Sequence, residues 1–216
     1  MNNSLQEYLN FANKLADAAG NTSMEYFRTS LSIDNKNDES PVTIADKNTE
    51  LKIRSMIEKE YPDHGILGEE FDSINSDAEF IWVIDPIDGT RSYIAGHKDF
   101  GNLISLTQNK KPIIGIINCP AHDERWVGVK NQSSTVNQQT INTSSVTAIE
   151  DAYIFTSGLY FDEPHLRNAV DKIKNKVRYF RYGGDCYMYG MVASGLIDIV
   201  IEDTLKVHDY MALVNV

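Results

Sequence analysis

The sequence predicts a first part of α+β type followed by a part of α/β type, and three observations lead to this prediction. Apolar residues near the N-terminus recur every three or four positions, the period of an amphipathic helix. Three β-rich runs between residues 103 and 129 follow one another with turn signals between them, which indicates an antiparallel meander. After Ile149, strand-like and helix-like runs alternate, as they do in α/β folds.

The composition fits one compact unit, or two joined halves that share a continuous interior. The chain has 216 residues, of which 42% are hydrophobic, so it can bury a sizeable core. No apolar run is long enough to cross a bilayer, and the start at Met1 lacks the features of a signal peptide. We therefore expect a soluble, cytoplasmic protein.

The charge and the cysteines exclude several classes of function. A formal net charge of −11 repels nucleic acid and anionic membranes, whereas it attracts cations. Cys119 and Cys186 lie far apart in the sequence without the paired spacing of zinc ligands. We expect two buried, reduced thiols rather than a disulfide or a zinc site.

The elements of the first part can be placed in order. A long helix is expected from Leu5 to about Phe27. The polar segment 34–40 shows no hydrophobic periodicity, so we expect a mobile loop there. Thr43 is expected to cap a second helix that runs toward Tyr61. The strands expected after it are 66–67, 80–84, 103–106, 112–117 and 124–129.

Segment 131–147 is rich in Ser, Thr, Asn and Gln, so it is either a surface hairpin or the connection between halves. We place the boundary between an N-terminal half, 1–148, and a C-terminal half, 149–216. The second half is expected to hold strands at 152–156, 177–182 and 197–201 and helices at 164–174 and 185–193. Asp209 then opens an apolar run resembling a helix of about two turns.

Segment 82–90 is the most informative part of the sequence. A buried-looking strand runs directly into Asp85 and Asp88, two carboxylates three residues apart. Magnesium is usually held by a few carboxylates together with water and substrate phosphate, and the carbonyl of Ile87 could add a ligand. These residues predict a magnesium site at the end of the strand.

The turn that follows suits a phosphate group. Gly89 lets the backbone approach a ligand closely, and Thr90 adds a hydroxyl at the expected start of a helix. We therefore expect phosphate to bind at this turn.

Two further acidic segments extend the site, although each also has a purely structural interpretation. Glu69 follows a predicted strand and Asp209 lies near the end of the chain. A Glu-Glu pair is commonly a solvated turn, and Asp209 or Asp185 before an apolar run is commonly a helix N-cap. Asp46 is likewise an acid that the dipole of its helix favours.

Taken together, these segments resemble the inositol monophosphatase superfamily. The pattern of that superfamily is G-E-E, then an apolar run with I-D-P-I-D-G-T, then W-D or a variant near the C-terminus. Here the matching segments are 68–70, 84–90 and His208-Asp209. The resemblance implies a layered αβαβα sandwich of the sugar-phosphatase type, a homodimer, and magnesium-dependent hydrolysis of a phosphate monoester.

The resemblance also implies a set of metal ligands. Glu69, Asp85 and the Ile87 carbonyl would hold one magnesium ion, and Asp85, Asp88 and Asp209 would hold a second. Two or three Mg²⁺ ions per site would clamp the phosphate for in-line displacement.

Further roles follow for residues near these ligands. Asp46 and Thr90 would orient the attacking water, Glu69 would also take part in catalysis, and Gly89 and Thr90 would bind the phosphate. Neither cysteine is expected to act as a nucleophile.

Within the superfamily the chain is most similar to the histidinol-phosphatase branch, which implies a role in histidine biosynthesis. The segments that carry this similarity are 88–97, 124–128, 182–187 and 209–213. His208 departs from the usual Trp, and the family normally continues for a few dozen residues past Val216, so we expect a chain truncated at its C-terminus.

The substrate remains open at this level. Histidinol phosphate has a cationic organic part, for which Asp185 and Glu202 are the candidate contacts. An inositol phosphate or a 3'(2'),5'-bisphosphate nucleotide would suit the same fold. A truncated chain that binds metal without catalysing a reaction is a further alternative.

Overall fold

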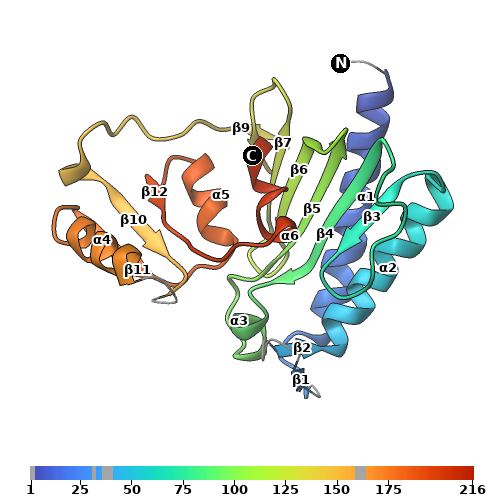
Figure 1. Ribbon diagram of the computed structural model, residues 1–216, viewed down its shortest axis with the longest axis horizontal. Coiled ribbons are helices and arrows are strands. Elements are labelled where there is room, and N and C mark those ends of the chain that lie inside the picture. Colours follow the sequence, from blue (N-terminus) through green and yellow to red (C-terminus); the bar gives the residue numbers. More distant parts are fainter. Residues whose placement is uncertain (1–2, 31–32, 36–40, 159–163) are drawn as a thin grey trace.

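The computed structural model describes residues 3–30, 33–35, 41–158 and 164–216 (Figure 1). Its helices are α1 (Asn3–Tyr26), α2 (Ile44–Glu60), α3 (Thr90–Ile94), α4 (Pro164–Lys174), α5 (Tyr187–Ala193) and α6 (Val207–Tyr210), with 3-10 turns η1 (Ile149–Asp151) and η2 (Leu213–Asn215). Its strands are β1 (Ile33–Asn35), β2 (Pro41–Thr43), β3 (Gly65–Gly68), β4 (Phe80–Asp88), β5 (Gly101–Gln108), β6 (Lys111–Cys119), β7 (Glu124–Val129), β8 (Thr135–Val136), β9 (Gln139–Thr140), β10 (Tyr153–Thr156), β11 (Tyr179–Tyr182) and β12 (Ile199–Val200).

Strands β3 to β9 form a large sheet in sequence order. β3 is parallel to β4, and each later strand is antiparallel to the one before it, so β5, β6 and β7 form the predicted meander. A small parallel sheet has the order β11-β10-β12. The parallel pairing in this second sheet fits the alternating pattern after Ile149.

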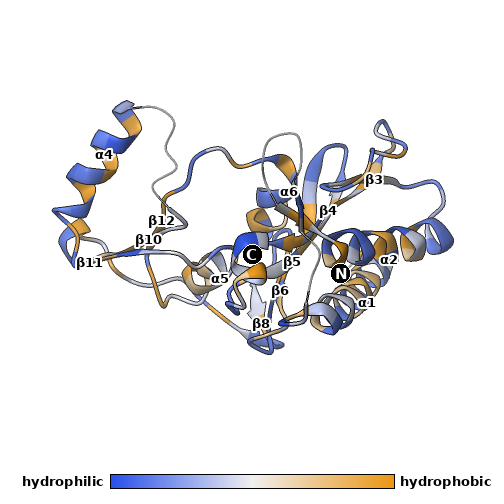
Figure 2. Cartoon of the chain, turned by 90° about the horizontal axis from the view of Figure 1, so that it is seen from below, coloured by the Kyte–Doolittle hydropathy of each residue, from blue (hydrophilic) through white to orange (hydrophobic). Residues whose placement is uncertain are grey.

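The elements stack in layers (Figure 1). Helices α1 and α2 cover one face of the large sheet, with Leu15, Ile53 and Trp82 buried between them. Helix α5 lies between the two sheets and contacts both β6 and β12. Helix α4 lies on the outer side of the small sheet. Figure 2 shows that these helices carry both hydrophilic and hydrophobic stretches, as expected of helices that cover a sheet with one face.

Several sequence predictions require correction. The strand expected at 80–84 continues to Asp88 as β4, with an irregularity in its pairing between Asp85 and Asp88. Residues 34 and 35, expected in a loop, belong to β1, which pairs with β2; residues 36–40 lie outside the described residues. The segment at 131–147, by contrast, agrees with its prediction: it contains the short β8–β9 hairpin and then leads toward the small sheet.

The predictions for the first helices and the cysteines are confirmed. Thr43 caps α2 in a capping box: its hydroxyl accepts from the N–H of Ala45, while its own N–H donates to Asp46. Cys119 and Cys186 are buried and unbridged. Among the described residues, no helix is both long and apolar enough to span a membrane.

Candidate metal centre

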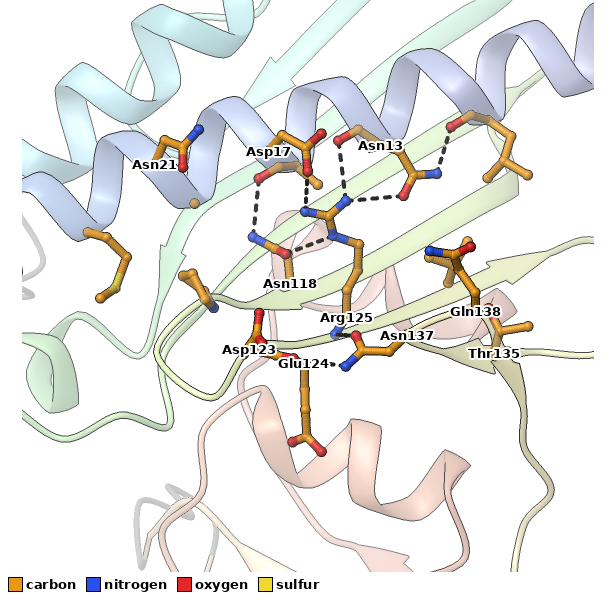
Figure 3. Close-up of a pocket in the computed structure, with 16 residues that line it drawn as sticks. Asn13, Asp17, Asn21, Asn118, Asp123, Glu124, Arg125, Thr135, Asn137 and Gln138 are labelled. Carbon is orange, nitrogen blue, oxygen red and sulfur yellow. Dashed lines mark hydrogen bonds and ion pairs between the residues drawn. The ribbon is translucent and has the colours of Figure 1, made fainter.

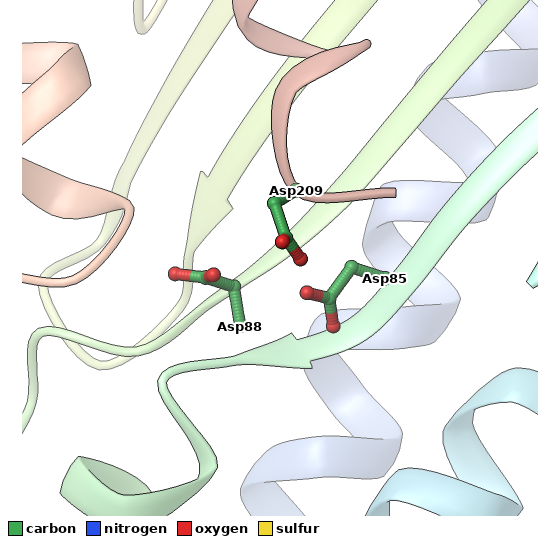
Figure 4. A group of neighbouring side chains, drawn as sticks. All are labelled: Asp85, Asp88 and Asp209. Carbon is green, nitrogen blue, oxygen red and sulfur yellow. The ribbon is translucent and has the colours of Figure 1, made fainter. Parts of the chain in front are cut away.

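Three carboxylates from distant parts of the chain meet beside the large sheet (Figure 4). Asp85 and Asp88 come from β4, and Asp209 comes from α6, 121 residues after Asp88. One oxygen of each side chain lies within 4.8 Å of the other two. Asp85 is only 2% exposed, whereas Asp88 and Asp209 are half-buried, so the group has a closed side and an open side.

The irregular end of β4 determines where its two acids point. Asp85 pairs with Leu103 on β5, but Asp88 pairs with Gly101, so Pro86 and Ile87 together lie opposite Asn102. Such a bulge bends the strand and changes the alternation of its side chains. It allows two acids three positions apart to approach a common point.

Asp88 is held from the opposite side by the turn before α5. The Cys186 N–H donates to Asp88 Oδ2 over 2.7 Å. Gly183 and Gly184 precede this turn with positive φ angles, and Asp185 itself has a φ of 39°. A Cβ on Gly89 would lie 2.8 Å from Asp185 Cγ, so the glycine permits the close contact between β4 and this turn.

The sequence suggested that Asp209 opens a helix of about two turns. In the structure it lies within the first turn of the shorter helix α6. Helix α6 begins at Val207 and spans one turn. The Lys206 N–H donates to Asp209 Oδ2 over 2.6 Å. His208 Nε2 lies 3.3 Å from Asp209 Oδ1 and 3.9 Å from Glu69 Oε1, so this histidine contacts two acids of the site.

Glu69 lies at the end of β3, beside the three aspartates but outside their closest group. The turn that carries it is fixed by Glu50, whose fully buried carboxylate accepts the Glu70 N–H over 2.8 Å. Arg54 pairs with Glu50 over 2.7 Å and so compensates the buried charge. A Cβ on Gly68 would collide with this Glu50 carboxylate, which explains the glycine before the two glutamates.

Asp46 and Thr90 lie against each other next to the end of β4. Asp46 is fully buried; its Oδ2 accepts from the Thr43 N–H and hydroxyl. Its other oxygen lies 3.2 Å from the Thr90 hydroxyl, which is also 3.1 Å from the carbonyl oxygen of Ile87. Gly89, with a φ of 82°, makes the turn into α3, as the sequence suggested.

The electrostatics of the group favour a bound cation. Burial, and then the negative charges of Glu69 and Asp88, raise the pKa of Asp85 well above its usual range. Burial likewise raises the pKa of Asp88, with further contributions from Asp185 and Asp209. Clustered hard oxygen ligands suit a divalent ion such as magnesium, which would relieve this repulsion. The residues present therefore fit a metal ion.

A cavity of about 260 Å³ opens beside Asp88 and Asp209. Among the residues that line it are Arg91, Asp185, Glu202 and Asp203. Asp185 is not the N-cap of α5, because Cys186 holds that position. The two predicted substrate contacts therefore share one cavity with two of the predicted metal ligands.

Glu202 is fixed within this cavity wall. Its Oε1 accepts the Ser157 N–H over 2.9 Å, and its Oε2 accepts from the Tyr189 hydroxyl over 3.0 Å. These contacts differ from the solvated strand end that is the usual environment of such a glutamate.

Sequence reasoning did not find Glu50 or the Cys186 N–H as supports of the site. Glu50 looks like any polar residue on a helix, and a backbone donor has no signature in the sequence. The paired Gly183 and Gly184 are the one local sign of an unusual backbone at that place.

The model of the inositol monophosphatase family matches residues 4–216 of the chain. The chain belongs to this family. Members of the inositol monophosphatase family are metal-dependent hydrolases of phosphate monoesters. The acidic cluster of this chain is consistent with that property.

The relatives in the family carry several names. The chain is 40% identical over 214 residues to the "Bifunctional phosphatase IMPL2, chloroplastic" of Arabidopsis thaliana, covering 98% of this chain and 62% of that protein. It is 34% identical over 210 residues to the "Histidinol-phosphatase" of Chlorobaculum parvum, covering 96% and 81% respectively. The chain thus spans less than two thirds of the Arabidopsis relative.

Solved structures of the inositol monophosphatase family have the same fold. An inositol monophosphatase from Zymomonas mobilis superposes with a TM-score of 0.87 and 42% identity, covering 97% of this chain and 81% of that one. One from Anabaena superposes with a TM-score of 0.85 and 28% identity, covering 98% and 81% respectively. The predicted layered α/β sandwich of the sugar-phosphatase type is confirmed.

Proposed function

We propose that this chain is a magnesium-dependent phosphatase of small phosphate monoesters. The observation that carries the proposal is the convergence of Asp85, Asp88 and Asp209 from two distant segments on one point beside a polar cavity. Membership of a family of metal-dependent phosphatases supports a role for this acidic group in binding metal.

We assign the metal ligands as two overlapping sets, for two or three ions. Glu69, Asp85 and the Ile87 carbonyl would hold one ion, while Asp85, Asp88 and Asp209 would hold another. When bound, magnesium lowers the pKa of water and stabilises the charge of the transferring phosphate.

The remaining roles fall to residues beside the ligands. Asp46 is anchored through one oxygen by Thr43, which supports a role for its other oxygen and the Thr90 hydroxyl in orienting an attacking water. The phosphate would meet the backbone of Gly89 and the Thr90 side chain. Direct attack by water needs no covalent intermediate, and the buried thiols of Cys119 and Cys186 have no part in it.

We propose histidinol phosphate as the substrate. Two observations support this choice: relatives from Chlorobaculum parvum and Mycobacterium tuberculosis are named histidinol-phosphatase, and the cavity beside the metal ligands contains Asp185 and Glu202. These two acids would face the cationic groups of histidinol. Inositol phosphate is the main competitor, because a relative of similar identity from Bacillus subtilis is named inositol-1-monophosphatase.

The test is release of inorganic phosphate from histidinol phosphate, inositol-1-phosphate and adenosine 3',5'-bisphosphate, each with magnesium and with EDTA. We expect phosphate release with magnesium and none with EDTA, and the highest kcat/KM for histidinol phosphate. Preference for inositol-1-phosphate would overturn the substrate assignment. No magnesium-dependent release from any of the three would favour a chain that binds metal without catalysis.

A further inference from the structure

A chain of buried and part-buried hydrogen bonds crosses the large sheet and ends at the segment of β4 that carries the predicted metal ligands. Arg125 Nε on β7 donates to Asn118 Oδ1 on β6 over 2.9 Å. Asn118 Nδ2 donates to Asn102 Oδ1 on β5 over 2.8 Å. Asn102 Nδ2 then donates to the carbonyl oxygen of Pro86 on β4 over 2.7 Å. Each step joins neighbouring strands of the sheet.

The groups at the two ends of this series fix the donor-to-acceptor direction of its hydrogen bonds. A guanidinium group can only donate hydrogen bonds, and a carbonyl oxygen can only accept them. Both amides between Arg125 and Pro86 must therefore point the same way, each accepting with its oxygen and donating with its nitrogen. Turning over either amide would place two donors or two acceptors against each other.

The Arg125 end of this series of hydrogen bonds is anchored firmly. Arg125 also donates to Asp17 Oδ1 over 2.7 Å and to Asn13 Oδ1 over 3.2 Å, both on α1 (Figure 3). These residues line a cavity of about 840 Å³ between α1 and strands β6 to β8. Asn118 is 4% exposed and Asn102 is fully buried, so the bonds nearer the metal site are shielded from water.

The Pro86 end of this series of hydrogen bonds reaches a predicted metal ligand through one peptide group. The carbonyl of the Pro86–Ile87 peptide accepts from Asn102, and the N–H of the same peptide donates to Asp85 Oδ1 over 3.0 Å. Because a peptide group is planar, holding its oxygen also fixes the direction of its N–H. Asn102 therefore influences Asp85 without touching it.

The bulge in β4 explains why a side chain is needed here. Asn102 alone lies opposite both Pro86 and Ile87, because the pairing with β5 shifts between Asp85 and Asp88. A bulged strand loses part of its regular ladder of backbone hydrogen bonds. The amide of Asn102 provides a bond at this interruption.

We propose that Asn102 is a positioning residue of the metal centre, which orients Asp85 through the Pro86–Ile87 peptide and is itself aligned by Asn118 and Arg125. The proposal rests on the proposed function in one respect, the assignment of Asp85 as a metal ligand. Groups that orient metal ligands typically contribute roughly 10–100-fold to metal affinity.

The experiment compares metal binding of purified variants in the absence of substrate. Mg²⁺ titration calorimetry, or Mn²⁺ binding followed by EPR, gives the dissociation constant. Asn102→Leu should bind metal roughly 10–100-fold more weakly than the wild type. If this variant does not fold, Asn102→Ser, which is too short to reach Pro86, takes its place with the same expectation.

Ser105 and Thr107 on the same strand provide matched controls. Each makes a buried side-chain bond to a backbone carbonyl, Ser105 to Ile114 over 2.9 Å and Thr107 to Ile81 over 3.2 Å. Ser105→Ala and Thr107→Val should lower the melting temperature but leave the metal dissociation constant unchanged. If the Asn102 variants bind metal as tightly as these controls, Asn102 is only a structural residue and the proposal is wrong.

The binding readout separates this inference from the proposed function. A wild type that binds magnesium but hydrolyses no phosphate ester would contradict the function and leave the comparison of Asn102 with its controls intact. A hydrolytically active wild type whose metal affinity is insensitive to Asn102 would contradict only the positioning role. A wild type without measurable metal binding would contradict both.

Discussion

At the scale of single residues, the substrate preference proposed above depends on Asp185 and Glu202. Both side chains line the cavity next to Asp88 and Asp209, and both are held by contacts that limit their movement. Burial raises the pKa of Asp185, and the charge of Asp99 adds to this effect. A cationic substrate group would favour the ionised form of this carboxyl and so bind to it well.

Removing either charge should reduce the discrimination between substrates. A hydrogen bond to a charged group contributes about 1.5–3 kcal/mol, so Asp185→Asn or Glu202→Gln should lower kcat/KM for histidinol phosphate roughly tenfold or more. The value for inositol-1-phosphate should fall much less. Steady-state kinetics of both variants with both substrates measures the difference, and equal losses for the two substrates would assign these acids a structural role.

At the scale of elements, the segment between α2 and β4 depends on a packed histidine. The His64 ring stacks on Tyr61 and Phe80, with ring centroids 4.6 and 5.1 Å away, and its Nδ1 accepts from Trp82 Nε1 over 3.1 Å. Burial lowers the pKa of His64 below its ordinary value of 6.5, although Asp63 and Glu79 oppose this shift. The neutral ring is therefore the form that the fold prefers.

This preference predicts a loss of stability in mild acid. Because the pKa of His64 is lower in the folded than in the unfolded state, its contribution is present above pH 6.5 and is lost as the pH falls through the folded value. Denaturant unfolding from pH 7.5 to 5 should show this loss in the wild type and a smaller pH dependence in His64→Phe. An equal pH dependence in the wild type and in His64→Phe would contradict this account.

Local patterns predicted the elements well, whereas contacts between elements were beyond their reach. Thr43 and Asp46 are three residues apart and signal the start of α2 directly, and α4 was expected at 164–174, the range that the structure gives. The bulge at the end of β4 depends on pairing with β5, so the run 80–84 seemed to end too early. Helix α6 is shorter than its apolar sequence suggested, because the chain turns at Met211 to lie against the large sheet.

The site residues divide in the same way into those that a local sequence pattern indicates and those that depend on contacts between elements. The acids of β4 were evident because the two carboxylates and the Gly-Thr turn are contiguous in the sequence. Their supports were not, because Glu50, Asn102 and the Cys186 N–H reach the site from elements 16 to 98 residues away from their partners. Only the folded backbone brings these groups together.

At the scale of the whole molecule, the position of Asp209 depends on how the C-terminal segment lies on the large sheet. The backbone around Ala212 packs directly on Gly115 of β6, and Asn215 packs on Gly128 of β7; a Cβ on either glycine would collide with a backbone carbonyl. These two glycines leave the sheet surface free of side chains where the segment crosses it. The packing fixes the chain only three residues after Asp209.

Gly115→Ala should therefore weaken metal binding. Loss of the contacts that orient a metal ligand typically costs roughly 10–100-fold in metal affinity. We expect a loss of this order, measured by Mg²⁺ titration calorimetry. Ile116→Val on the same strand is the control, because its side chain packs in the core with α1 and α2. It should cost about 0.5–1.5 kcal/mol of stability with unchanged metal affinity. An unchanged dissociation constant in Gly115→Ala would show that Asp209 is positioned by other contacts.

The most direct test of the metal centre as the place of phosphate hydrolysis is a comparison of wild type and Asp88→Asn. Asparagine preserves the size of the side chain but replaces an anionic ligand with a weaker neutral one. With histidinol phosphate and increasing magnesium, the wild type should release phosphate in a metal-dependent way, and Asp88→Asn should lose this release while its circular dichroism spectrum stays unchanged. Magnesium-stimulated turnover by Asp88→Asn at the wild-type rate would contradict the assignment of the site.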